Sequence, residues 1–159
     1  MRKPYLVFFL VASLLFGKES LGQSFSLTDS VFQKDDTLRK TIYFDYDSFR
    51  LLPESELFLD SLAMVMHYFD SLIIQIESNT DDRGSDEYNY QLSERRARAI
   101  KDYLMFRKIL PVRLVAVGNG EKDPLIPVKE IEAMKTEAEQ EHARALNRQT
   151  VFRIIGFKK

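Results

Sequence analysis

Residues 79–97 read NTDDRGSDEYNYQLSERRA, and the rest of the fold can be worked out from this stretch. Its first part, 79–85, is polar and contains Gly84, which is typical of a loop. The segment before it, 72–76, is almost continuously apolar and predicts a buried strand. After the loop, apolar residues recur every three to four positions, which predicts a helix over about 86–107. The stretch therefore predicts a strand–loop–helix unit with a charged, polar loop at its centre.

The segments outside this unit alternate between strand and helix patterns. They predict strands at 41–44, 113–117 and 150–155, a helix at 53–69 and a charged helical stretch at 128–146. Alternating elements around one small sheet predict an α+β fold of the two-layer α/β sandwich type. In this prediction a β-α-β-α-β core forms a mixed sheet, and the charged stretch is a helical insertion before the last strand.

The start of the chain has a different character from the rest. Residues 1–22 combine a positively charged beginning, a short apolar run and small residues before the predicted cleavage point, which is typical of a signal peptide. An uncleaved N-terminal anchor helix is the alternative interpretation. Residues 23–37 are mostly polar and without a period, so we predict a linker or flexible arm. The folded domain is then expected to occupy 38–159.

The composition limits the classes of protein to which the chain can belong. A length of 159 residues with 45% hydrophobic and 30% charged residues is typical of one globular domain with a leader. The formal net charge of -1 gives no general positive field, which argues against nucleic acid as a partner. The chain has no cysteine, and so neither a disulfide nor a thiol for lipid attachment.

Four segments, taken together, identify a family. The first segment is the quoted stretch, which contains in order the motif elements Thr-Asp, Gly, Tyr-Asn, Leu-Ser and Arg-Ala. The other three segments are residues 42–45, 118–124 and 147–148. These segments resemble the OmpA C-terminal-like family, which includes outer-membrane protein A, peptidoglycan-associated lipoproteins and the flagellar stator protein MotB. Two positions depart from the family pattern: Asn79 stands where the family often has His, and Gln149 replaces the second Arg of the closing motif.

The resemblance implies a ligand and the residues that bind it. The ligand would be the diaminopimelate-containing stem peptide of peptidoglycan, whose distal carbon carries both an ammonium and a carboxylate. Asp81 would then be the fixed anion and Arg96 the fixed cation, since a guanidinium grips a carboxylate with two hydrogen bonds. Thr80 and Asn89 would flank the same pocket, and Arg148 would add positive potential.

Four of these residues also have a purely structural interpretation. Leu92, Arg96 and Ile100 are spaced by four, so Arg96 is predicted to lie on the apolar seam of its helix and to need a partner. A plain Asp81–Arg96 ion pair that fastens the loop to the helix would satisfy that need. Asn89 would bond locally in the first helical turn, and Arg148 would be solvated near a strand start.

No other pattern in the chain points to chemistry. The acidic residues lack the spacing of a calcium loop, the two histidines lack a metal-ligand pattern, and no catalytic motif occurs. We therefore predict no enzyme, no metal and no cofactor. The first function hypothesis is an exported periplasmic module at the inner face of the outer membrane that tethers an outer-membrane partner to peptidoglycan. The alternative is a periplasmic protein-interaction domain, with 23–37 or 130–146 as its docking surface.

Overall fold

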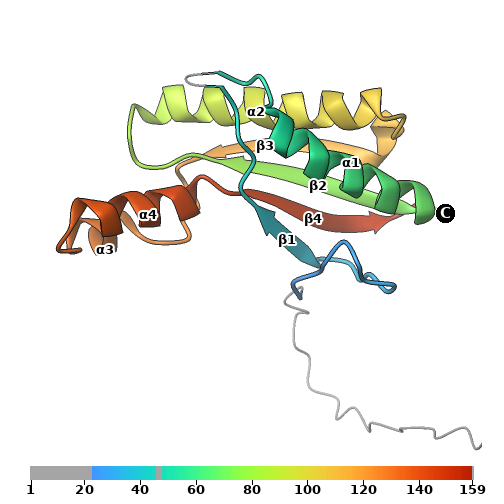
Figure 1. Cartoon of the computed structure of the whole chain (residues 1–159), viewed down its shortest axis with the longest axis horizontal. Coiled ribbons are helices and arrows are strands. Elements are labelled where there is room, and N and C mark those ends of the chain that lie inside the picture. Colours follow the sequence, from blue (N-terminus) through green and yellow to red (C-terminus); the bar gives the residue numbers. More distant parts are fainter. Residues whose placement is uncertain (1–22, 46–47, 159) are drawn as a thin grey trace, which may run out of the picture.

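The computed structural model describes residues 23–45 and 48–158, and the predicted signal peptide lies outside these residues. A single four-stranded sheet organises the domain (Figure 1). Its spatial order is β1-β4-β2-β3, formed by β1 (Thr37–Lys40), β4 (Thr150–Phe157), β2 (Leu72–Asn79) and β3 (Leu114–Gly120). The β2–β3 pair is parallel, whereas β4 is antiparallel to both of its neighbours. The sheet is therefore mixed, as predicted.

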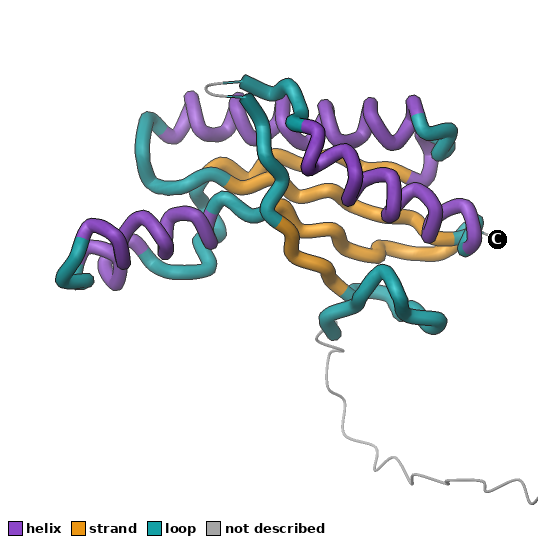
Figure 2. Tube along the Cα trace, in the orientation of Figure 1, coloured by secondary structure: helices purple, strands orange, loops and turns teal. Residues whose placement is uncertain are grey.

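Two long helices cover one face of this sheet (Figure 2). They are α1 (Pro53–Tyr68) and α2 (Asp86–Phe106). Between α2 and β3 lies a 3-10 turn, η1 (Pro111–Arg113), and between β3 and β4 lie α3 (Val128–Glu132) and α4 (Glu137–Asn147). The predicted two-layer sandwich with a helical insertion before the last strand is confirmed, and α3 and α4 project from one end of it.

The core lies between the two helices and the sheet. Its fully buried side chains come from every layer: Leu59, Leu62 and Met66 of α1, Ile100 and Leu104 of α2, and Ile74, Ile76, Phe152 and Ile154 of the sheet. Burying each of these large apolar side chains contributes about 1.5–3 kcal/mol. The buried face of α2 at Ile100 and Leu104 matches the helical period that the sequence predicted.

A glycine allows α2 to approach β3 closely. A Cβ atom built on Gly118 would lie 2.6 Å from Ser93 Oγ and 2.7 Å from Glu94 Cα. At this point the backbone of α2 rests directly on the strand, which only a residue without a side chain permits. Ser93 Oγ completes the contact by accepting a hydrogen bond from the Gly120 N–H at 2.9 Å. The start of α2 is thereby fixed relative to the end of β3.

The first strand lies earlier in the chain than predicted. Residues 41–44 have strand propensity, yet the pairing with β4 is made by Thr37–Lys40. Tyr43 instead accepts a hydrogen bond from Leu52 N at 3.0 Å, and its own N–H donates to Ser55 Oγ at 2.6 Å. Residues 41–44 thus connect the sheet edge to the start of α1, because tertiary contacts outweigh their strand propensity, although it is stronger than that of Thr37–Lys40.

Two further segments differ in detail from their predicted form. The charged stretch is two helices, because Thr136 and Glu139 form a reciprocal capping box that starts α4 afresh. Within 23–37, predicted to be a linker or flexible arm, Phe25 is buried in the core and its N–H donates to Thr37 O at 2.9 Å. An aromatic side chain packed against the sheet explains how this polar segment is held.

Candidate ligand-binding site

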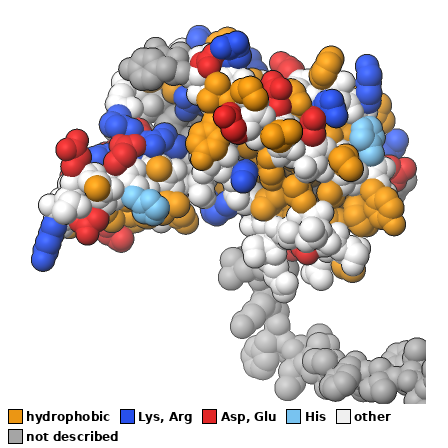
Figure 3. Space-filling view, viewed as in Figure 1, with side chains coloured by type: hydrophobic (Ala, Val, Ile, Leu, Met, Phe, Trp, Pro, Cys, Tyr) orange, Lys and Arg blue, Asp and Glu red, His pale blue; other side chains and the backbone are white. Residues whose placement is uncertain are grey.

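All five residues predicted to bind a ligand line one cavity of about 410 Å³. The cavity lies where β2 ends, α2 begins and α4 leads into β4. Its lining consists of the five predicted residues Thr80, Asp81, Asn89, Arg96 and Arg148, together with Phe44, Asp45, Arg83, Tyr88 and Leu92. Three arginines and two aspartates therefore meet around one opening. Figure 3 shows acidic and basic side chains gathered at the end of the molecule formed by α4.

The loop between β2 and α2 carries most of this lining. Thr80 N–H donates to Gly120 O at 2.9 Å, which extends the β2–β3 pairing by one residue. Gly84 has a φ of 109°, a value that side chains disfavour, and turns the chain toward the helix. Ser85 then caps α2 by accepting a hydrogen bond from Tyr88 N. The loop is thus anchored at both ends and presents Asp81 at a fixed place.

Asp81 is buried and bound by two arginines. Its Oδ2 atom lies 2.7 Å from Arg83 Nη2 and 2.5 Å from Arg148 Nη1, and its Oδ1 accepts from Arg83 N at 3.1 Å. Burial acts to raise the pKa of the Asp81 carboxyl. The hydrogen bonds from Arg83 and Arg148 outweigh burial and hold this pKa below its ordinary value of 3.8. The cavity floor therefore holds a carboxylate that is ionised at neutral pH.

Arg96 also lines the cavity and does not form the structural ion pair considered from the sequence. Among the described residues, the ion pairs of Asp81 are those with Arg83 and Arg148. Arg96 Nε donates to Ser48 O at 3.3 Å, and its guanidinium lies 5.0 Å from the centre of the Phe44 ring. This cation–π contact helps to hold the guanidinium in position beside the cavity.

Thr80 and Asn89 are both buried, in different ways. Asn89 Nδ2 donates to Asp81 O at 3.2 Å and to Glu121 Oε2 at 2.5 Å, so its amide nitrogen holds the loop together. Thr80 is 4% exposed, and among the described residues its hydroxyl is the buried side-chain polar atom without a hydrogen-bond partner. Buried polar groups are normally paired, so the unpaired hydroxyl of this cavity-lining residue is unusual.

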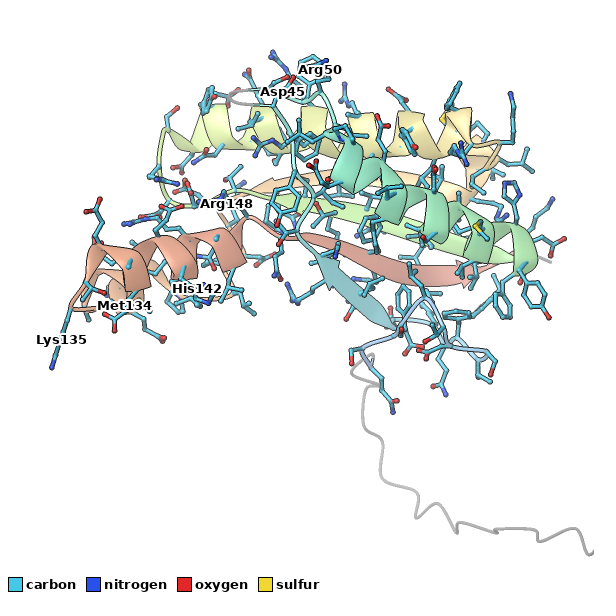
Figure 4. The ribbon with its side chains drawn as sticks, viewed as in Figure 1. Asp45, Arg50, Met134, Lys135, His142 and Arg148 are labelled. Atoms are coloured by element: carbon cyan, nitrogen blue, oxygen red, sulfur yellow. The ribbon has the colours of Figure 1, made fainter. Side chains whose placement is uncertain are left out.

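Two charged residues that form ion pairs around Asp81 and Arg148, Arg83 and Glu141, do not appear in the sequence-based prediction. Arg83 follows Asp81 by two positions inside the quoted stretch, so its position in the sequence could have indicated the ion pair with Asp81. Glu141 of α4 lies 3.2 Å from Arg83 Nη1 and 2.8 Å from Arg148 Nη2. Nothing local in the sequence indicates that contact, because it depends on how α4 is placed. Figure 4 shows Arg148 where α4 meets the sheet, with Lys135 at the far tip of the projecting helices.

A larger cavity of about 550 Å³ lies elsewhere, on the outer side of α1 and α2. Its lining includes the exposed Phe49 and Phe106 and the arginines Arg95 and Arg98. Among the described residues that line it there is no buried carboxylate comparable to Asp81, so we assign the ligand site to the smaller cavity. Within the described part of the chain, no helix has both the length and the apolar character needed to cross a membrane.

Comparison with known proteins assigns the chain to a family and supports the fold. The model of the OmpA family matches residues 43–141. The chain belongs to the OmpA family. The chain is 35% identical over 117 residues to outer membrane protein A of Bordetella avium, covering 74% of this chain and 55% of that protein. It is 37% identical over 106 residues to the peptidoglycan-associated lipoprotein of Pseudomonas putida, covering 65% of this chain and 63% of that protein.

A solved structure shares the fold of this OmpA-family chain. The peptidoglycan-associated lipoprotein of Burkholderia pseudomallei is 28% identical and superposes with a TM-score of 0.58, covering 70% of this chain and 86% of that one. The chain spans roughly half to two thirds of the length of the curated relatives named above. The resemblance found in the quoted motifs is thereby confirmed.

Proposed function

We propose that this domain binds peptidoglycan non-covalently through the diaminopimelate-containing stem peptide. The observation that carries the proposal is the single cavity that brings buried Asp81 together with Arg96 and Arg148. A ligand end that carries both an ammonium and a carboxylate needs fixed charges of both signs within one opening. This cavity supplies them, with an ionised Asp81 at its floor.

The chemistry of the lining supports a division of roles. Arg96, which contacts the Phe44 ring, suits a carboxylate, because a guanidinium donates two parallel hydrogen bonds. Asp81 suits the ammonium, and the orphaned hydroxyl of Thr80 suits a further polar atom of the ligand. Asn89 acts indirectly in this scheme, because its amide nitrogen holds the carbonyl of Asp81 and the carboxylate of Glu121.

We further propose that binding tethers an envelope component to the cell wall, in the periplasm at the inner face of the outer membrane. Support comes from the relatives, one of which is an outer membrane protein and another a peptidoglycan-associated lipoprotein. The component tethered would be an outer-membrane protein. The role is one of attachment, with no catalytic residue assigned.

A second candidate is a protein-interaction domain that keeps the fold without binding glycopeptide. The larger cavity over α1 and α2 favours it, because Phe49 and Phe106 at its rim are 51% and 72% exposed. Large exposed aromatic side chains are enriched at protein interfaces. The two candidates use different surfaces and can be separated by substitution.

The deciding experiment is a calorimetric titration of the purified protein with a diaminopimelate-containing muropeptide. Arg96→Ala and Asp81→Asn are expected to abolish binding, since each removes a charge that the ligand pairs with. Arg95→Ala is the matched control, because Arg95 is the neighbouring arginine of α2 and lines the larger cavity instead. Circular dichroism checks that each variant is folded. A folded wild-type protein that binds no muropeptide would refute the proposal.

A further inference from the structure

The two arginines that bind Asp81 are also bound from outside by a second carboxylate. Arg83 uses Nη2 for Asp81 Oδ2 at 2.7 Å and Nη1 for Glu141 Oε2 at 3.2 Å. Arg148 uses Nη1 for Asp81 Oδ2 at 2.5 Å and Nη2 for Glu141 Oε1 at 2.8 Å. Each guanidinium therefore bridges an inner and an outer carboxylate, and the four side chains close a ring of alternating charge.

The two carboxylates of this ring differ sharply in exposure. The side chain of Asp81 is 8% exposed, whereas that of Glu141 is 49% exposed. Buried, hydrogen-bonded charges are held firmly, while exposed ion pairs contribute little and exchange readily with solvent ions. Asp81 is thus a fixed part of the site, and Glu141 is the member that another anion can replace.

The helix that carries Glu141 is fastened to the binding loop by a separate contact. Arg144 Nε lies 2.9 Å from Asp82 Oδ1, and these side chains are only 18% and 16% exposed. Asn147, at the end of α4, adds hydrogen bonds to both the N–H and the carbonyl of Ile126 at 2.8 and 2.9 Å. These contacts leave α4 in place when Glu141 itself is displaced.

We propose that Glu141 is an internal carboxylate occupying an anion subsite formed by Arg83 and Arg148, and that a ligand carboxylate binds there by displacing it. This inference rests on the proposed function and specifies its selectivity. A stem peptide would compete with Glu141 through a second carboxylate, while Arg96 binds the first. Through Glu141, the insertion helix α4 thereby weakens the binding of ligands that carry a single carboxylate, because their binding free energy is too small to displace Glu141.

The test compares wild type with Glu141→Gln in a calorimetric titration with the same muropeptide. Removing the competing charge is expected to lower the Kd about three- to tenfold, because two partly exposed ion pairs no longer oppose binding. Glu137→Gln is the matched control: it removes one negative charge from the first turn of the same helix and is expected to leave the Kd unchanged. An unchanged or raised Kd in folded Glu141→Gln would overturn the inference.

A simple probe keeps this test separate from the proposed function. Sodium acetate is titrated into nitrogen-15-labelled protein while the arginine Nε–H signals of Arg83 and Arg148 are followed. These signals are expected to shift at severalfold lower acetate concentration in Glu141→Gln than in wild type or Glu137→Gln. Equal acetate midpoints for wild type, Glu141→Gln and Glu137→Gln would overturn the proposed anion subsite. If muropeptide binds no variant, the proposed function fails, and the acetate midpoints still decide whether Glu141 blocks the two arginines.

Discussion

The hydroxyl of Thr80 offers the sharpest prediction, because stability and binding should change in opposite directions. The residue is buried, and its Oγ1 is the buried side-chain polar atom without a partner in the described part of the chain. Thr80→Val replaces that hydroxyl with a methyl group of nearly the same shape. An unsatisfied buried polar group costs about 1–3 kcal/mol. Thr80 lines the open cavity, so we expect the lower end of this range, a gain in stability of about 1 kcal/mol for Thr80→Val.

The same substitution should weaken ligand binding. A neutral hydrogen bond to a ligand contributes about 0.5–1.5 kcal/mol, so its loss is expected to raise the Kd for muropeptide about three- to tenfold. Thr80→Ser is the matched control. It keeps the hydroxyl but removes a buried methyl group, so it should lose about 1 kcal/mol of stability and retain binding.

Thermal unfolding and calorimetric titration measure both effects. A gain of about 1 kcal/mol corresponds to a rise in Tm of about 3–5 °C for a domain of this size. A fall in Tm for Thr80→Val would show that the hydroxyl is satisfied in the native state. An unchanged Kd would show that it does not meet the ligand, and either result would refute the argument.

The remaining predictions concern the charge of Asp81 and the packing of α2. Because the folded state holds the Asp81 pKa below 3.8, the carboxylate stabilises the protein above that pH, and this contribution is lost as the pH falls through the folded-state pKa. Melting curves should show that wild type is more stable than Asp81→Asn at neutral pH, and the difference in stability between the two should shrink below pH 3.8. A difference in stability that does not depend on pH would contradict this. Gly118→Ala should cost about 3 kcal/mol in urea unfolding, because its Cβ would meet the backbone of α2. Gly156→Ala, with nothing within 4 Å of the new Cβ, should change stability far less, and equal losses would refute the packing argument.

Local patterns in the sequence were sufficient for most of the fold. Helix and strand periods are properties of neighbouring residues, so α1, α2 and β2 begin within a residue of their predicted positions. The first strand was displaced although 41–44 has the stronger strand propensity, because pairing with β4 decides which residues form the edge strand. The division between α3 and α4 was readable in principle from the capping box at Thr136 and Glu139.

The candidate site likewise has a part that local sequence predicts and a part that depends on tertiary packing. The quoted stretch placed Thr80, Asp81, Asn89 and Arg96 at the junction of a strand and a helix, and the structure brings them into one cavity with Arg148. Of the two partners of Asp81, Arg83 lies two positions away in the quoted stretch, whereas Arg148 was not predictable from spacing. Arg148 lies far along the chain and reaches Asp81 only because β4 pairs with β2.

Local sequence patterns alone were enough to establish the strand–loop–helix unit that contains 79–97, the alternation of elements and the types of charge in the loop. These depend on local period and on turn residues, which neighbouring positions decide. The packing of distant segments was needed to bring Arg148 to Asp81, to place Glu141 against Arg83 and Arg148, and to leave the Thr80 hydroxyl without a hydrogen-bond partner. Ion pairs and orphaned groups arise when distant segments pack together, and no local pattern specifies which side chains then meet.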